Sequence, residues 1–336
     1  MSEVKMTNTD SRDSLLVLDH VSKFYGTVIG VGDLNLNLPR GAYGLVGPNG
    51  SGKTTLINLM TGAFAPSIGT VKILGRNPAK QRDVLASIGL CPASDILYPN
   101  VSAFHWVSYL TELHGFSKSE AEDRAVKSLR ELGMEANMMR PIGSYSLGMR
   151  QRTKLAQATA HDPELLILDE PFNGLDPIGR HDLSEFLGNW NASGKSLILA
   201  SHILHEVEAI TSSFLLIHGG RILASGDASE VRTMLRGFPV EVRLTGRGLD
   251  HLAGVLSQES WMMGLDFEDA GQTLVIRVGD KGAFYDRLRE LACDEKIALN
   301  SIDSPDGSLE SAFDLLLRVH RGELLEGGVQ ELAKAT

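Results

Sequence analysis

Two patterns of hydrophobic spacing alternate along the first two thirds of the chain. LVLDHVSKFY and LNLNLPRG alternate apolar and polar residues with period two, as half-buried antiparallel strands do. AYGLVG, ELLILDE and SLILASH are short unbroken apolar runs, which suit the strands of a buried parallel sheet. Helical patterns separate these runs, so residues from about 15 to 235 predict an α/β core whose mixed sheet has an antiparallel flank.

One helical pattern between these runs has a clear start and end. In SKSEAEDRAVKSLRELGM, Ser119 precedes Glu122 by three residues, which is the spacing of an N-terminal capping box. The face that this helix would bury holds Ala121, Ala125, Leu129 and Leu132. We expect the helix to end at Gly133 and to belong to a helical subdomain of about residues 95–160.

The pattern changes after Gly237. From VEVRLTG to KIALNSID the runs follow the order β-α-β-β-α-β of a ferredoxin-like unit, with a hairpin turn near residues 269–271. A last helix in SLESAFDLLLRVHRGE would follow a Ser308 cap and carry Leu309, Phe313 and Leu316 on one face. We therefore expect a flexible tail at 1–13, an α/β domain at 14–236, a small α+β domain at 237–322 and a second tail at 323–336.

Composition and charge limit the classes of function. A net charge of −10 argues against binding nucleic acid through phosphate neutralisation, so no nucleic-acid partner is expected. The two cysteines, Cys91 and Cys293, cannot form a disulfide framework, and no Cys/His spacing indicates zinc. The polar N-terminus lacks the core of a signal peptide, and no apolar run is long enough to span a membrane. These features predict a cytoplasmic protein.

The stretch GPNGSGKTT matches the pattern of a phosphate-binding loop. Gly47 is followed, after four residues, by Gly52, Lys53 and Thr54, with a strand-like run before the loop and a helical run after it. Lys53 would reach the β- and γ-phosphates of a nucleotide, and the Thr54 hydroxyl would bind Mg²⁺. The expected binding residues are Gly47, Asn49, Gly50, Ser51, Gly52, Lys53, Thr54 and Thr55. The alternative is a glycine-rich turn that binds nothing.

Two later strand-like runs end in polar residues. LLILDEP places Asp169 at a strand end as a candidate Mg²⁺ ligand, and Glu170 next to it as a candidate general base for an attacking water. SHILHEVE places His202 at the next strand end, where its imidazole could hold the charge of the γ-phosphate. Without a phosphate loop, the acidic pair would more often be a solvated strand end and the histidine a structural residue.

A second anion site is expected in YSLGMRQR. Ser146 has the chemistry of an N-cap and Gly148 falls in the first turn, so free N–H groups and a hydroxyl would meet there. Since the chain already has one phosphate loop, this second site would serve the nucleotide held by another subunit. The alternative is an ordinary capped helix.

In chain order, GPNGSGKTT, YSLGMRQR, LLILDEP, NGLDP and SHILHEVE resemble the Walker A, signature, Walker B, D-loop and H-loop motifs of ABC transporter ATPase subunits. The resemblance covers residues from about 15 to 235. It implies that Tyr25 in VSKFYG stacks on adenine, that Phe24 points to the core, and that Asp176 links the two sites of a dimer. It also implies ATP as substrate and Mg²⁺ as cofactor.

The same resemblance implies the partners. Two ATPase subunits, expected as a homodimer, would dock on membrane permease subunits encoded separately, at the inner face of the cell membrane. YSLGM in place of LSGGQ, with Leu147 for the first glycine, is similar to subunits of exporters. A permease would dock beside DILYPNVSAFHWVSYLTELHG, whose aromatic residues could instead be simple core; they are Tyr98, Phe104, Trp106 and Tyr109.

Other functions stay open at this point. A soluble ABC-type ATPase that acts as a mechanical switch on ribosomes or nucleic acid is the main alternative. Such relatives usually carry two cassettes or long helical insertions, whereas this chain has one cassette. A phosphate-loop kinase or GTPase is disfavoured because no N-K-x-D box is present and Glu170 directly follows Asp169.

One position departs from the family pattern. In IGLCPASD, the strand ends at Pro92, and the family usually places a glutamine next, whose amide meets Mg²⁺ or the attacking water. Here the next residue is Ala93, which has no polar side-chain atom. Either Ser94 or Asp95 compensates, a water fills the gap, the coupling to the permease is altered, or the backbone turn alone suffices.

Overall fold

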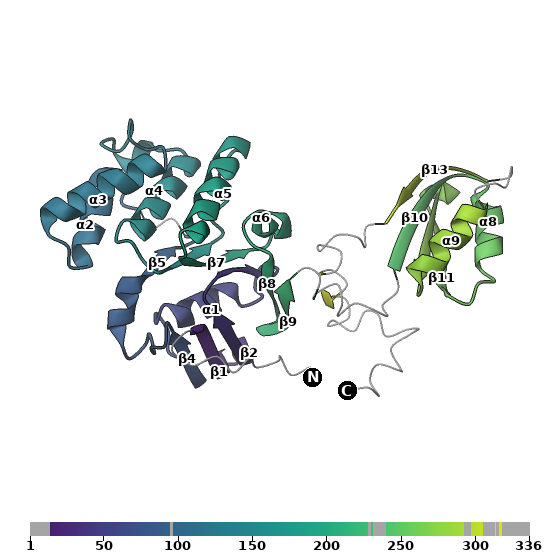
Figure 1. The fold of residues 1–336 in the computed structure, drawn as a ribbon, viewed down its shortest axis with the longest axis horizontal. Helices are drawn as coiled ribbons and strands as arrows, with labels where there is room; N and C mark the ends of the chain where they lie inside the picture. The colour runs from purple at the N-terminus through teal and green to yellow at the C-terminus, as the bar shows by residue number, and fades with distance from the viewer. Residues whose placement is uncertain are drawn as a thin grey trace. The chain divides into compact units, whose positions relative to one another are not determined.

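The chain divides into two compact units, residues 1–227 and 228–336, each with its own core (Figure 1). The computed structural model describes residues 14–94, 97–227, 230, 240–291, 297–304, 313 and 316–317. The expected tails at 1–13 and 323–336, the expected domain boundary at 236–237 and most of the last predicted helix lie outside these described residues.

An antiparallel sheet of three strands forms one part of the first unit. It contains β1 (Ser14–Tyr25), β2 (Val28–Pro39) and β4 (Ile68–Ile73), in the order β2-β1-β4. Along β2, Leu34, Leu36 and Leu38 are buried while the asparagines between them are exposed. The period-two pattern of the sequence therefore predicts this flank correctly.

A sheet of six strands forms the centre of the first unit, in the order β5-β6-β7-β3-β8-β9. Its strands are β3 (Ala42–Val46), β5 (Ile88–Cys91), β6 (Leu165–Asp169), β7 (Ser196–Ser201), β8 (Ser213–His218) and β9 (Arg221–Asp227). Only the β8–β9 pair is antiparallel. Every residue of β6 and β7 is buried, as unbroken apolar runs predict. The parallel strands all point their carboxyl ends to one edge, where ligands bind in such sheets.

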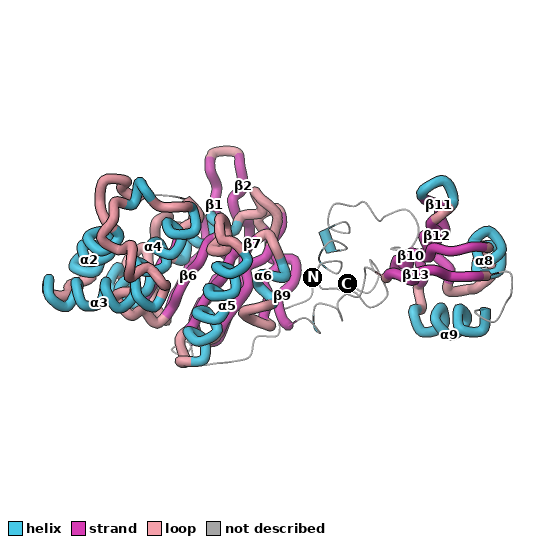
Figure 2. Tube along the Cα trace, turned by 90° about the horizontal axis from the view of Figure 1, so that it is seen from above, coloured by secondary structure: helices cyan, strands magenta, loops and turns pink. Residues whose placement is uncertain are grey.

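The helices of the first unit fall into two groups. Helices α5 (Pro177–Ala192) and α6 (Leu204–Glu208) connect strands of the central sheet, and α1 (Lys53–Met60) leads from β3 of that sheet to β4 of the antiparallel sheet. Helices α2 (Ala103–Leu113), α3 (Lys118–Glu131) and α4 (Leu147–Thr159) contact one another beside β5. Figure 2 shows this helical group next to the β5–β6 end of the sheet, with β9 at the other end. Two 3₁₀ turns, η1 (Arg82–Ser87) and η2 (Ile142–Ser144), complete the unit.

Helix α3 begins two residues earlier than its sequence predicts. The cap is Ser117, whose hydroxyl accepts the Glu120 N–H at 3.4 Å while the Glu120 carboxylate accepts the Ser117 N–H at 3.0 Å. The prediction of Ser119 and Glu122 was wrong because the same spacing occurs twice, and the earlier pair brings two more residues into the helix. The predicted end is confirmed, since Gly133 follows the last turn with φ of 68°.

Among residues 240–304 of the second unit, the described part forms a four-stranded antiparallel sheet and the helices α8 and α9. Its elements follow the predicted order β-α-β-β-α-β: β10 (Val240–Arg247), α8 (Leu249–Leu256), β11 (Met262–Glu268), β12 (Thr273–Val278), α9 (Lys281–Leu291) and β13 (Ala298–Asp303). The strand order is β11-β12-β10-β13, and the 3₁₀ turn η3 (Asp269–Gly271) joins β11 to β12. Both helices pack on one face, where Leu252, Phe284 and Leu288 meet Val242 and Ile276.

The described helices do not meet the requirements of a membrane span. None of the helices in the described part of the chain combines the length and the apolar composition needed to cross a bilayer.

Candidate active site

The loop between β3 and α1 has a backbone that only glycine accommodates at several positions. Gly50 and Gly52 have φ of 78° and 110°, in the left-handed region that other residues avoid. A Cβ on Gly47 would lie 2.2 Å from the carbonyl oxygen of Ile217, and one on Gly52 would lie 2.7 Å from that of Gly30. The glycine spacing of the motif therefore has a steric cause. Asn49 and Gly50 are exposed at the tip of the loop.

Lys53 folds back over this loop. Its Nζ donates to the carbonyl oxygens of Gly47 at 2.7 Å and Pro48 at 3.3 Å, and lies 3.6 Å from Oε1 of Glu170. Ser51 is buried, and its hydroxyl oxygen has no hydrogen-bond partner among the described residues. A buried unsatisfied hydroxyl in the same loop as a buried ammonium group fits a ligand that carries negative oxygens. The residues present therefore fit the phosphates of ATP.

Asp169 ends β6 at the same edge of the sheet. Its side chain is buried, and its Oδ2 accepts a hydrogen bond from the Thr54 hydroxyl at 3.2 Å. Burial raises the pKa of the Asp169 carboxyl, and the charge of Glu170 adds to the rise; the Thr54 hydrogen bond and the charges of Lys53 and Lys154 oppose it. A hydroxyl and a carboxylate in contact are oxygen ligands of the kind that Mg²⁺ takes beside a nucleotide. The donor set fits the ion.

Glu170 lies between a lysine and a histidine. Its Oε1 is 3.6 Å from Nζ of Lys53, and its Oε2 is 2.9 Å from Nδ1 of His202, which follows β7. The backbone of Glu170 is left-handed, with φ of 51°, and its N–H donates to the Ala200 carbonyl at 2.9 Å. Because Nδ1 of His202 faces Glu170, Nε2 is the ring atom left to meet a phosphate. The three predicted catalytic residues therefore lie together.

Tyr25 lies near the start of α1, across Gly30. A Cβ on Gly30 would be 2.7 Å from the Tyr25 ring and 3.0 Å from the Thr55 hydroxyl, so the ring and the end of the phosphate loop approach each other. The ring stands edge-on to Phe64, with centroids 5.9 Å apart, and keeps an exposed face. The prediction that Phe24 points to the core was wrong, since its side chain is 40% exposed. Irregular pairing with β2 on both sides of Lys23 breaks the alternation there.

Ser146, Gly148 and Asp176 form a separate group at two helix starts. The Ser146 hydroxyl caps α4 by accepting the Met149 N–H at 3.2 Å, as predicted, and the Asp176 carboxylate caps α5 by accepting the Gly179 N–H at 2.7 Å. Gly148 lies in the first turn of α4, against the segment that precedes Asp176. Among the described residues, no hydrogen bond or ion pair joins this group to Lys53, Asp169, Glu170 or His202.

Comparison with known proteins identifies the family. A family model described as ABC transporter matches residues 31–173. The chain is 36% identical to the bacitracin transport ATP-binding protein BcrA of Enterococcus faecalis over 303 residues, which cover 89% of this chain and 95% of that protein. The chain belongs to the ABC transporter family of ATP-binding subunits. It is an ATPase of that family, and the family fold predicted from the sequence is confirmed.

Two further relatives are named for transport or export. The ABC ATPase is 35% identical to the Nod factor export ATP-binding protein I of Cupriavidus pinatubonensis, over 73% of this chain and 75% of that protein. It is 36% identical to the lantibiotic transport ATP-binding protein SrtF of Streptococcus pyogenes, over 62% of this chain and 89% of that protein.

Solved structures share the fold. An ATP-binding subunit of an ABC transporter superposes with a TM-score of 0.61 at 29% identity, covering 73% of this chain and all of that one. The dimeric bacterial ABC transporter cassette MJ0796 superposes with a TM-score of 0.58 at 22% identity, over 63% of this chain and 98% of that one, and at this identity the likeness concerns the fold alone.

Sequence reasoning missed three residues around the site of this ABC ATPase. Gly30 brings Tyr25 and Thr55 together, and only the packing between β2 and α1 reveals it. Gln151 and Lys154 on α4 are buried and bond to the end of β5 and the turn after it. Their signal in the sequence is two long polar side chains, three residues apart, on the face that a helix would bury.

Ala93 stands at the turn where the family usually has glutamine. It is exposed, and its carbonyl oxygen accepts a hydrogen bond from Lys154 at 3.3 Å. Ser94 is exposed as well, and Asp95, the other candidate for compensation, lies outside the described residues.

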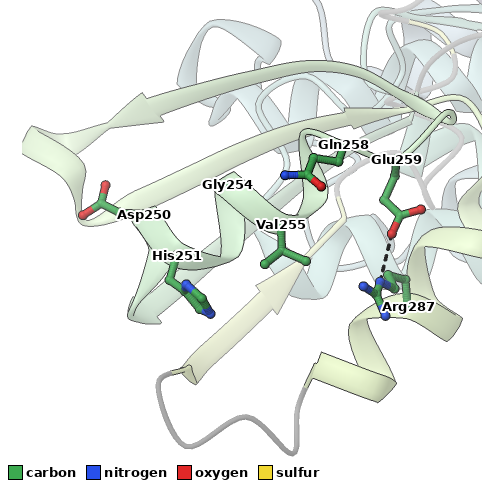
Figure 3. Close-up of a pocket in the computed structure, with 7 residues that line it drawn as sticks. All are labelled: Asp250, His251, Gly254, Val255, Gln258, Glu259 and Arg287. Carbon is green, nitrogen blue, oxygen red and sulfur yellow. Dashed lines mark hydrogen bonds and ion pairs between the residues drawn. The ribbon is translucent and has the colours of Figure 1, made fainter.

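A cavity of about 430 Å³ lies in the second unit and contains none of the predicted site residues (Figure 3). Figure 3 shows Arg287 of α9 facing Glu259 across it. This guanidinium pairs with two carboxylates, Glu259 at 2.9 Å and Glu290 at 2.7 Å, so its positive charge is already balanced. The cavity is therefore a poor phosphate site, and the nucleotide chemistry belongs to the first unit.

Proposed function

We propose that this ABC ATPase hydrolyses MgATP between two subunits and thereby drives a separately encoded permease that exports its substrate. The observation that carries the proposal is the set of contacts among Lys53, Glu170 and His202 beside the Thr54–Asp169 pair. A phosphate-binding cation, a carboxylate base and an imidazole lie within ion-pair or hydrogen-bond distance of one another there. Transfer of a phosphoryl group to water needs these groups together.

Each of these residues has a defined task in the proposal. Lys53 gives up its bonds to the loop carbonyls and binds phosphate oxygens. Thr54 and Asp169 would hold Mg²⁺, which supplies positive charge to the phosphates when it is bound. Glu170 accepts the proton of the attacking water, and His202 donates from Nε2 to the γ-phosphate as its charge grows. Tyr25 offers its exposed face to the adenine ring.

The dimer follows from the separation of the two groups of residues. Ser146 and Gly148 present the start of α4 as an anion site, yet no described contact joins them to the phosphate loop of their own chain. A second copy could bring this helix start against the γ-phosphate, so that each nucleotide is enclosed by two chains. Asp176, which caps α5 next to that helix, would then stand at the contact between the copies.

The permease partner and the direction of transport rest on the relatives. Proteins named for bacitracin transport and Nod factor export align over most of their own lengths. We infer an exporting permease and a place at the inner face of the cell membrane, reached through that partner. The aromatic segment at α2 offers a docking surface, since Tyr98 and Tyr109 are 63% and 58% exposed. Trp106 packs against this surface: its ring centroid is 5.3 Å from that of Tyr98, and its Nε1 donates a hydrogen bond to Gln157.

The Glu170→Gln variant tests the proposal most directly. Glutamine keeps the size of the side chain but cannot accept the proton, so ATP turnover should fall by about 10²- to 10⁴-fold. ATP binding should persist, and an ATP-bound dimer should accumulate on size exclusion. Glu164→Gln, which neutralises an exposed carboxylate paired with Arg40, is the matched control and should keep the parent rate. A Glu170→Gln variant with parental turnover would refute the assigned base.

A further inference from the structure

Lys154 is a buried lysine beneath the turn that follows β5. It lies on α4, is 4% exposed, and donates from Nζ to the carbonyl oxygens of Pro92 at 3.0 Å and Ala93 at 3.3 Å. Within the described part of the chain it forms no ion pair. Burying an ammonium group without a carboxylate partner is unfavourable for stability. A role in the site would explain why the charge is placed there.

The neighbours of Lys154 belong to two strand ends. One turn earlier on α4, Gln151 donates to the Cys91 thiol at 3.5 Å, so α4 holds the end of β5 at two points. Cys91 pairs with Leu168 in the adjacent strand β6, which places the turn after β5 beside Asp169. Lys154 bonds to Pro92, the residue after Cys91, and Asp169 is the residue after Leu168, so the register of β5 and β6 brings the lysine to the strand ends where Asp169 lies. Lys154 therefore joins α4 to the turn that lies beside Asp169.

We propose that Lys154 is a positioning residue that fixes the Pro92–Ala93 turn to α4 and places a positive charge beside Asp169. The inference rests on the proposed function, in which Asp169 holds Mg²⁺. The side chain of Ala93 has no polar atom with which to reach the site, so the main-chain carbonyls and the lysine make the connection. Because α4 begins at Ser146, a shift of its anion-binding end is passed along one rigid helix to the turn.

The Lys154→Met variant tests the inference, since methionine keeps the length of the side chain and removes the charge and the hydrogen bonds. We expect the Mg²⁺ concentration for half-maximal ATPase activity to rise by about tenfold, the lower end of the effect of residues that orient metal ligands. Thermal stabilisation by ATP in excess chelator, which depends on Lys53, should stay parental. The added stabilisation on supplying Mg²⁺ should shrink.

Two further variants make the result specific. Lys154→Gln can still donate to a carbonyl but has no charge, so it should share the weaker response to Mg²⁺ even if Lys154→Met does not fold. Lys127→Met removes the same charge from α3, where the side chain is 78% exposed, and should behave as the parent. Parental Mg²⁺ dependence in Lys154→Gln would overturn the inference. An unmodified protein that ATP stabilises equally with and without Mg²⁺ would instead refute the proposed function.

Discussion

The residues that follow β3, β6 and β7 bond to one another, whereas the side chains of Ser146 and Asp176, in the described part of the chain, bond to the first turns of their own helices. Lys53, Glu170 and His202 are tied by contacts of 3.6 and 2.9 Å, and Thr54 donates to Asp169. The side chains of Ser146 and Asp176 accept hydrogen bonds from N–H groups in the first turns of α4 and α5, respectively. The contacts at the strand ends are thus already formed within one chain, while under the proposed function the helix starts would complete the site of a second copy.

Lys53→Ala should have the largest effect, because it removes the cation from the contacts at the strand ends. We expect thermal stabilisation by MgATP to be lost, which for a ligand at a hundred times its Kd amounts to about 2.7 kcal/mol. Differential scanning fluorimetry with and without MgATP measures this. Lys72→Ala, on an exposed position of β4, is the control. Stabilisation equal to that of the parent would count against the phosphate loop.

Gly148→Asp should break only the helix-start half, since it puts a negative charge at the first turn of α4, where a phosphate is expected to bind. Alone it should be as inactive as Lys53→Ala. Mixed in equal amounts, the two variants should regain about a quarter of parental ATPase activity, because half of the random dimers carry one intact composite site of two. If mixing restores nothing, the two halves do not meet across subunits.

Asp169→Asn should make the folded protein more stable while weakening its response to MgATP. Burial raises the pKa of Asp169 in the folded chain, so its ionised form lowers the free energy of unfolding at neutral pH. Asparagine should therefore raise the melting temperature of the nucleotide-free protein near pH 7. The gain should vanish as the pH falls below the ordinary range of aspartate, where the carboxyl is protonated in both states.

Thermal melts across this pH range, with Asp123→Asn at an exposed position as control, decide the question. The response of Asp169→Asn to MgATP should weaken at the same time. A lower melting temperature for Asp169→Asn at neutral pH would contradict the assigned cost of burying the charge.

Ala93→Gln should have the smallest effect, since the site functions around an alanine. It restores the side chain that the family usually has at this turn, and we expect the ATPase rate, or its dependence on the permease, to change by a few-fold, on the order of 1 kcal/mol or less in barrier height. Steady-state assays of the free and permease-bound forms measure it. Equal rates in both forms would show that the position is silent.

The half of the site at the strand ends could be predicted from the sequence, because hydrophobic runs locate the ends of parallel strands and those ends share one edge. Lys53, Asp169, Glu170 and His202 follow from that rule together with their motifs. The separate helix starts also follow, since Ser146 has a cap signal within its own segment.

Other features depend on contacts that a linear pattern does not contain. Phe24 is exposed because of irregular strand pairing, and pairing partners decide where such irregularities occur. The sequence indicates that Lys154 is a polar residue on the buried face of a helix. It does not indicate which strand end the lysine contacts. The start of α3 was missed because two identical cap spacings overlap at Ser117 and Ser119.

The left-handed backbone of Glu170 has a genetic consequence. Glycine is the residue that this conformation suits, and other residues give up about 1–2 kcal/mol there. Codons for glutamate and glycine differ by a single base, so one point mutation would relieve the backbone while removing the carboxylate from between Lys53 and His202. Under the proposed function, that single change would leave a subunit that binds ATP and does not turn it over. The backbone at this position thus favours glycine, and under the proposed function the need for turnover is what would keep glutamate there.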